Sequence, residues 1–130
     1  MRKARAVEYV GRDEVPACSG VYTAWLTGEP RCFYVGRATD SKTGTLKNRI
    51  ASHFRGQRGC DQFCLYVHDS YIYPERCTTN EALTTKQVNE RTGEWIKKHI
   101  SFRWLEVPAE EAPSAEAALR RRLRPILNPP

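Results

Sequence analysis

Two short runs of β-branched and aromatic residues, separated by a turn, constrain the fold of this chain most. The first run is Gly20 to Leu26, and the second is Cys32 to Gly36. Such runs are typical of strands, and Gly28-Glu29-Pro30 between them supplies residues that turns favour. Strands joined by so short a loop pair antiparallel. The sequence therefore predicts a β-hairpin over residues 20–36.

A change of periodicity after this hairpin predicts helices. Leu46, Ile50 and Phe54 recur every four residues, as on one face of an amphipathic helix that ends before Gly56. A helix is expected over 61–72, ended by Pro74, and another over 84–100, with Thr84 or Thr85 as N-cap and Gly93 as a residue that weakens it. A strand is expected over 102–107. The last expected helix runs from the N-cap Ser114 to about residue 123 and is stopped by Pro125. This order predicts an α+β fold in which a small antiparallel sheet is flanked by helices.

The size and charge of the chain narrow the classes of function. A length of 130 residues predicts one domain, and no apolar run approaches the roughly 18 residues of a membrane span. The 21 Lys and Arg residues outnumber the 15 Asp and Glu residues, and a net charge of +6 suits a polyanionic partner. The N-terminus lacks the apolar stretch of a secretory signal, and five cysteines without framework spacing indicate reduced thiols. We therefore expect a cytoplasmic protein.

Two tyrosines, one arginine and one histidine are the candidate site residues that the pattern itself suggests. Tyr22 and Tyr34 occupy the two strands of the hairpin, while Arg49 and His53 lie one turn apart on the following helix. Arg49 and His53 flank the apolar stripe on the same side, so they can line a cleft beside the sheet. Cleavage of a phosphodiester needs a base that activates water and cations that neutralise the phosphate.

The same residues fall into motifs that resemble the GIY-YIG nuclease family. Gly20-Val21-Tyr22 matches its first signature and Tyr34-Val35-Gly36 its second, with eleven residues between the two tyrosines. Arg49 and His53 match the arginine and a frequent histidine of the family's first helix. Near the C-terminus, Glu116 and Asn128 match a metal-binding glutamate and an asparagine that follows a proline. The resemblance runs from about residue 18 to the end of the chain.

This resemblance implies a three-stranded antiparallel sheet and hydrolysis of DNA with one divalent ion, Mg²⁺ or Mn²⁺. By its pattern, Tyr22 deprotonates the attacking water, Tyr34 arranges water and phosphate, Arg49 stabilises charge on the phosphate, and Glu116 holds the metal. His53 joins the catalytic set, and Arg37, Arg120 and Asn128 are expected to contact the DNA or support the site. The family core is expected over about 18–56 and 99–130 of the single domain, with a longer helical segment over about 57–98.

Other interpretations of these residues remain open. Glu116 can form an ordinary i,i+4 ion pair with Arg120, and His53 can be a structural histidine. The arginines of the last helix can be a solvated helix end. Cys60, Cys64 and His68 share one helical face, but without an evident fourth ligand they do not predict a zinc site. The alternative function is a nuclease-fold protein without cleavage activity that binds nucleic acid or a small molecule.

Overall fold

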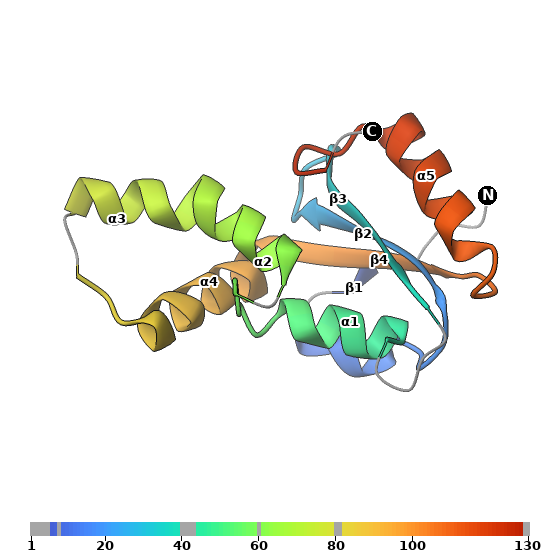
Figure 1. Ribbon diagram of the computed structural model, residues 1–130, viewed down its shortest axis with the longest axis horizontal. Coiled ribbons are helices and arrows are strands. Elements are labelled where there is room, and N and C mark those ends of the chain that lie inside the picture. Colours follow the sequence, from blue (N-terminus) through green and yellow to red (C-terminus); the bar gives the residue numbers. More distant parts are fainter. Residues whose placement is uncertain (1–5, 8, 40–43, 60, 80–81, 129–130) are drawn as a thin grey trace. The chain divides into compact units, whose positions relative to one another are not determined.

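A computed structural model of the chain describes residues 6–7, 9–39, 44–59, 61–79 and 82–128 (Figure 1). The chain divides into two compact units. The first comprises the residues up to Ala51 together with those from His99 onward, and the second comprises Ser52–Lys98. The first unit contains the sheet, and the second is helical. None of the described helices combines the length and apolar character needed to cross a membrane.

An antiparallel sheet forms the centre of the first unit. Its strands are β1 (Ala6–Val7), β2 (Gly20–Leu26), β3 (Cys32–Ala38) and β4 (Ile100–Glu106), in the order β1-β4-β2-β3. The predicted hairpin and third strand are confirmed as β2, β3 and β4, and the short β1 adds to the outer edge of β4. The β2–β3 turn contains Gly28 at a φ of +84°, a backbone conformation that glycine adopts without strain.

Helices cover the two sides of this sheet (Figure 1). The helix α1 (Leu46–His53) begins beside the start of β2, where the side chain of Leu46 occupies the space next to Gly20. The backbone N–H of Leu46 donates to the carbonyl of Cys18, which fixes the start of α1 to the segment before β2. The helix α5 (Ala112–Leu123) packs on β3 and β2. Because both faces are covered, successive β2 residues such as Val21 and Tyr22 are buried.

The last helix starts earlier than the sequence predicts. Ser114 was the expected N-cap, but α5 begins at Ala112, and the Ser114 hydroxyl donates to the carbonyl of Glu111 within the first turn. Pro113 lies in that turn, where its missing N–H costs no helical hydrogen bond. The prediction of Ser114 as N-cap was therefore wrong. The predicted end before Pro125 is confirmed, since Arg124 adopts a left-handed φ of 46°.

Helices make up the second unit. They are α2 (Gln62–Val67), the π-helical turn η2 (His68–Ile72), α3 (Tyr73–Thr79) and α4 (Thr85–His99). The next element along the chain after α4 is β4. The 3₁₀ helix η1 (Tyr9–Glu14) belongs to the first unit. Thr84 caps α4 as expected, because its hydroxyl accepts from Gln87 N–H and the Gln87 side chain accepts from Thr84 N–H. The prediction that Pro74 ends a helix was wrong. Pro74 stands in the first turn of α3, directly after the π-helical turn, where a proline is tolerated.

Gly93 in α4 has a packing role within the second unit. A Cβ atom at Gly56, which has a φ of +72°, would lie 2.2 Å from the Gly93 nitrogen and 2.3 Å from the carbonyl oxygen of Asn89. Conversely, a Cβ atom at Gly93 would lie 3.0 Å from the carbonyl oxygen of Phe54. The turn after α1 therefore contacts the backbone of α4 directly. The lower helix propensity of Gly93 is the cost of this close packing.

Candidate active site

The two tyrosines lie side by side on β2 and β3. Their ring centroids are 6.3 Å apart, and the ring of Tyr22 also packs edge-on against Phe102 of β4 at 6.2 Å. In the strand register Tyr22 is opposite Gly36, and Tyr34 is opposite Ala24, so both tyrosines occupy the same face of the hairpin. Tyr22 is 3% exposed, and Tyr34 is half-buried.

The position of the Tyr22 ring depends on Gly36. A Cβ atom at residue 36 would lie 2.4 Å from Cζ and 2.5 Å from Oη of Tyr22, closer than real side chains approach one another. The phenol therefore occupies the space that any larger residue at this position would need. The second signature glycine thus sets the location of the first signature tyrosine.

Two arginine side chains form ion pairs with Glu116 on α5. The Glu116 carboxylate lies 3.9 Å from Nε of Arg37 on β3 and 3.6 Å from Nη1 of Arg120 one helical turn later. The i,i+4 ion pair with Arg120 is therefore present, and Arg37 adds a second cation. The Glu116 side chain is 17% exposed, whereas Arg37 is 45% exposed. Because Gly36 and Arg37 are consecutive, the end of β3 carries both the glycine beside Tyr22 and the arginine beside Glu116.

Asn128 clamps the outer edge of β3. Its Oδ1 accepts from Val35 N–H at 3.1 Å, and its Nδ2 donates to the Val35 carbonyl at 2.5 Å. Leu127 N–H donates to the Phe33 carbonyl, so the segment after α5 follows β3 like an added strand. The Arg120 Nε donates to the Asn128 carbonyl at 3.1 Å and holds this segment against α5. Asn128 and Arg120 thus have structural contacts, and contact of either residue with a substrate stays a prediction.

Arg49 and His53 occupy one side of α1, one turn apart. Arg49 is exposed, and its position follows from the helix start, where the Thr45 hydroxyl accepts from Asn48 N–H. His53 ends the helix and is only 4% exposed. The convergence of these two residues with the tyrosines and Glu116 stays a prediction.

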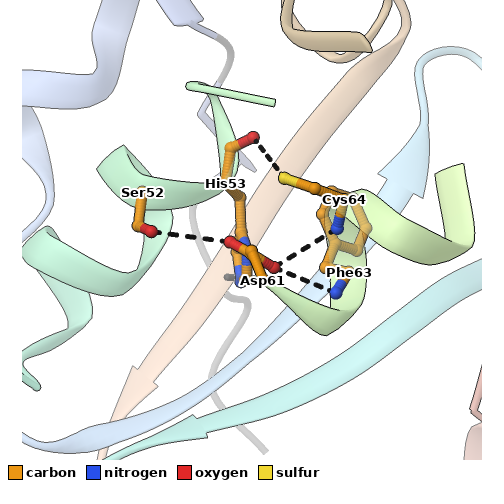
Figure 2. Close-up of polar contacts among 5 residues, drawn as sticks. All are labelled: Ser52, His53, Asp61, Phe63 and Cys64. Atoms are coloured by element: carbon orange, nitrogen blue, oxygen red, sulfur yellow. Dashed lines mark hydrogen bonds and ion pairs between the residues drawn. The ribbon is translucent and has the colours of Figure 1, made fainter. Parts of the chain in front are cut away.

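The imidazole of His53 belongs to a buried network in the second unit (Figure 2). Its Nδ1 lies 2.7 Å from Oδ2 of Asp61, which also accepts from the Ser52 hydroxyl at 3.5 Å. The other oxygen of Asp61 caps α2, accepting from the N–H groups of Phe63 and Cys64 at 2.9 and 3.2 Å. The Cys64 thiol donates to the His53 carbonyl at 3.3 Å. This network joins the end of α1 to the start of α2.

Two opposing effects determine the pKa of the Asp61 carboxyl. Burial raises this pKa, but the hydrogen bond and charge of His53 and the N–H groups of Cys64 and Phe63 together lower it below its ordinary value. Asp61 is therefore a carboxylate at neutral pH. Burial, reinforced by the charge of Asp61, raises the pKa of the Cys64 thiol far above its ordinary range. Cys64 thus remains a protonated hydrogen-bond donor.

The side chains that can hold a metal ion differ in chemistry between the two units. Glu116 offers carboxylate oxygens, which suit Mg²⁺ or Mn²⁺, and its ion pairs show that it already stabilises cationic partners. Ligand atoms of His53, Asp61 and Cys64 lie within 4.8 Å of one another, but a nitrogen, oxygen and sulfur set does not suit a hard cation. Glu116 therefore fits the expected ion, and the His53 network does not.

The zinc arrangement considered from the sequence receives no support from the described residues. Cys60 lies outside them. Cys64 bonds to the His53 carbonyl, whereas His68 bonds through Nδ1 to Asp69 at 2.9 Å and through Nε2 to Arg76 at 3.3 Å. Cys64 and His68 therefore have separate partners.

Asp61 is the residue of interest that the sequence patterns missed. The segment from Asp61 to Val67 matched no catalytic motif, although an Asp immediately before an apolar helical run is a typical N-cap. That signal predicts the cap but not the histidine, which lies eight residues earlier on another helix.

Comparison with protein families finds a match over most of the chain. The family model described as GIY-YIG catalytic domain matches residues 20–129. No curated protein and no solved structure matches the chain. The matched range includes both tyrosines, Arg49, Glu116 and Asn128.

Proposed function

Because this chain belongs to the GIY-YIG family of nuclease domains, we propose that it is a metal-dependent endonuclease that hydrolyses DNA phosphodiester bonds. Membership supports a nuclease-type function and a nucleic-acid substrate. The observation that carries the finer proposal is the pair of Tyr22 and Tyr34 beside Gly36, next in sequence to the Arg37–Glu116 ion pair. Gly36 and Arg37 are consecutive in β3, so their side-chain positions alternate across the sheet, and the meeting of Tyr22 with Glu116 at one site is part of the proposal.

The proposed roles follow from the chemistry of each side chain. Tyr22 accepts the proton of the attacking water, and Tyr34 hydrogen-bonds water or phosphate beside it. Arg49 is always cationic and exposed, so it stabilises the negative charge that develops on the phosphate. His53 takes part as a further proton-handling residue. Asn128 holds β3, and therefore Tyr34, in place through Val35.

Glu116 is the proposed ligand of one divalent ion, Mg²⁺ or Mn²⁺. Bound there, the ion would supply Lewis-acid stabilisation of the leaving oxygen. Arg37 and Arg120 balance the Glu116 charge in the ion pairs of the structure. When Glu116 binds a cation, the Arg37 guanidinium loses its ion-pair partner and can bind phosphate oxygens, whereas Arg120 keeps its hydrogen bond to the Asn128 carbonyl.

Charge distribution supports DNA as the partner. Residues 52–98 carry seven Lys and Arg residues against six Asp and Glu residues, a net charge of +1. The remaining residues carry fourteen against nine, so five of the six net positive charges belong to the unit with the tyrosines and Glu116. We therefore propose that binding rests on phosphate contacts and weakens steeply with ionic strength.

The second candidate is a nuclease-fold protein that binds nucleic acid without cutting it. The observation in its favour is that two arginines already pair with Glu116, and they compete with a metal ion for the same carboxylate. A binder of this kind would keep its DNA affinity in EDTA and would show no cleavage in Mg²⁺ or Mn²⁺.

A plasmid-nicking time course tests the two candidates. The protein should nick supercoiled DNA in Mg²⁺ or Mn²⁺ and stop when EDTA is added. Tyr22→Phe removes only the phenolic oxygen and should lower the rate roughly 10²-fold or more. Arg49→Ala should lower the rate by a comparable factor with little change in DNA affinity, since it acts on transition-state charge. Unchanged nicking by Tyr22→Phe would contradict the proposed base.

A further inference from the structure

Three side chains with different ligand atoms meet where α1 ends and α2 begins (Figure 2). His53 offers a ring nitrogen, Asp61 a carboxylate oxygen and Cys64 a sulfur, and these atoms lie within 4.8 Å of one another. All three residues belong to the second unit, so the grouping is a property of one compact body. A hydrogen-bonded pair of His53 and Asp61 needs no thiol beside it. The presence of all three ligand types at one point indicates a metal site.

The ligand types and their spacing favour zinc over a hard cation. Imidazole nitrogen, carboxylate oxygen and thiolate sulfur are the usual zinc ligands of proteins, at about 2.0–2.3 Å from the ion. Tetrahedral geometry at those bond lengths places neighbouring ligand atoms roughly 3.3–3.8 Å apart. In the structure Nδ1 of His53 lies 2.7 Å from Oδ2 of Asp61, and every pair of ligand atoms lies within 4.8 Å. Side-chain rotations that move these atoms by about 1 Å therefore suffice to coordinate zinc.

The charge of the three ligands suits a divalent ion in a buried place. The His53 and Asp61 side chains are 5% and 8% exposed, and Cys64 is fully buried. A buried charge is stable only when it is paired. Asp61 supplies one negative charge and the thiolate of Cys64 another, while a neutral imidazole supplies none. The ligands therefore balance the charge of Zn²⁺.

Contacts already hold the ligands in place, as the outer shell of a metal site does. Oδ1 of Asp61 accepts from the N–H groups of Phe63 and Cys64, which leaves Oδ2 beside His53 as the ligand oxygen. The Phe63 ring packs against the imidazole with centroids 4.8 Å apart and restricts its rotation. Coordination through Nδ1 leaves the other ring nitrogen for a hydrogen bond, as is usual for a histidine ligand.

We propose that His53, Asp61 and Cys64 bind one zinc ion, which fastens the end of α1 to the start of α2. On binding, Zn²⁺ takes the place of the hydrogen between Nδ1 and Oδ2, and the imidazole stays neutral with its one hydrogen on the other nitrogen. The Cys64 thiol releases its proton to solvent and no longer donates to the His53 carbonyl. Water takes the fourth position, as in zinc sites with three protein ligands.

A zinc link has a structural purpose in this unit. The elements α2, η2 and α3 contain six, five and seven residues, and helices below about 12 residues are marginal by themselves. Small scaffolds use metal ions to supplement their cores. The inference goes beyond the proposed function and does not rest on it, because its ligands differ from Glu116. A zinc-bound His53 cannot also take up a proton, so the site and the proton-handling role of His53 exclude each other.

Metal analysis of the purified, untagged protein tests the site. One equivalent of zinc should remain bound after dialysis, and EDTA should remove it. Cobalt(II) added to the zinc-free protein should produce the near-ultraviolet absorption of a thiolate–cobalt bond, which reports a cysteine ligand. Addition of zinc should abolish this absorption and raise the melting temperature of the zinc-free protein, because an ion that binds the folded state stabilises it.

Variants identify the ligands. Cys64→Ala and Asp61→Asn should each lower the zinc affinity by at least roughly 10²-fold, since changes to outer-shell partners alone cost about 10- to 100-fold. Asp61→Asn keeps a good helix cap and removes only the charge. Cys77→Ala is the matched control, because Cys77 is an exposed cysteine of the same unit, and it should keep one equivalent of zinc. If thermal melts show Cys64→Ala to be unfolded, Cys64→Val, which preserves more of the buried volume, replaces it.

The results separate this inference from the proposed function. Zinc binding by a protein that nicks DNA in no divalent ion would support the site and remove the nuclease proposal. Nicking in Mg²⁺ by a protein that binds no zinc at micromolar concentration would support the nuclease proposal and overturn the site. The site is also overturned if a folded Cys64→Ala protein binds zinc as tightly as the unmodified protein, or if the cobalt complex lacks the thiolate absorption.

Discussion

Replacement of Gly36 by alanine tests the link between the hairpin and the candidate site. The new Cβ would lie 2.4 Å from Cζ of Tyr22, whereas ordinary van der Waals contacts of a Cβ begin at 3.4 Å. The end of the phenol ring must therefore move by about 1 Å, a displacement that can cost roughly 10²-fold in rate at a catalytic group. Tyr22 is 3% exposed and packs on Phe102 and Tyr34, so the ring cannot move without disturbing them. We expect a destabilisation of about 1–3 kcal/mol as well.

The assay for Gly36→Ala combines single-turnover nicking of supercoiled plasmid with urea unfolding and a DNA-binding titration. Gly59→Ala is the matched control, because a Cβ at Gly59 meets no atom within 4 Å and its φ is not in the left-handed region. The control should keep the parent rate and stability. DNA affinity should change little in either variant, since the role proposed for Tyr22 is in the chemical step and not in phosphate binding.

A double variant identifies the route of the effect. If Gly36→Ala acts by displacing the Tyr22 hydroxyl, it should cost little additional rate when Tyr22 is already phenylalanine. Parent-like nicking and unfolding of Gly36→Ala would refute the reasoning, because the hairpin would then accommodate a methyl group without moving the phenol. An additive loss in the double variant would show that Gly36 acts elsewhere.

Four further outcomes are expected. Glu116→Gln should largely abolish metal-dependent nicking while DNA affinity, measured by titration, stays equal or rises, and nicking at the parent rate would contradict the one-metal proposal. Asn128→Ala should lower the free energy of unfolding by about 1–3 kcal/mol in urea melts, because Val35 loses both of its clamp hydrogen bonds. Folding lowers the pKa of Asp61, so its contribution to stability is present above about pH 4 and is lost as the pH falls through the folded-state pKa. Asp61→Asn should therefore be less stable than the parent at pH 7, and this difference in the free energy of unfolding should shrink as the pH falls below about 4. Burial raises the pKa of the Cys32 thiol from 9.0 to about 11, so its contribution to the free energy of unfolding is present below pH 9. That free energy should fall by up to about 3 kcal/mol as the pH rises to 11, and Cys32→Ala should not show this loss.

Local patterns in the sequence determined much of the first unit. The hairpin strands β2 and β3 follow from β-branched and aromatic runs around a Gly/Pro turn, and α1 follows from the spacing of Leu46 and Ile50. The Thr84 cap was also predictable, because a threonine followed three residues later by glutamine forms a local capping box. Each of these features depends on residues that are close in sequence, so propensity and periodicity suffice to identify it. The site tyrosines were found for the same reason, since they lie inside those strands.

Contacts between residues distant in sequence could not be predicted in this way. The sequence patterns missed two helix boundaries. The helix α5 starts before the expected N-cap Ser114, and a helical segment continues past Pro74 because the π-helical turn before α3 accommodates the proline. The glycine at position 93 is explained by its close contact with the turn at Gly56, whereas its low helix propensity indicated only a locally weaker helix. The pairing of β3 with the segment after α5 likewise follows from packing.

The candidate site shows the same division. The sequence identified the candidate catalytic side chains, since Tyr22, Arg49 and Glu116 each lie in a recognisable motif. Tertiary structure decided their partners. Arg37 reaches Glu116 only because α5 packs on β3, and the Asp61 carboxylate meets His53 only because the chain turns between α1 and α2. A side chain's identity is encoded locally, but its protonation state and charge balance depend on the neighbours that folding brings within a few ångströms.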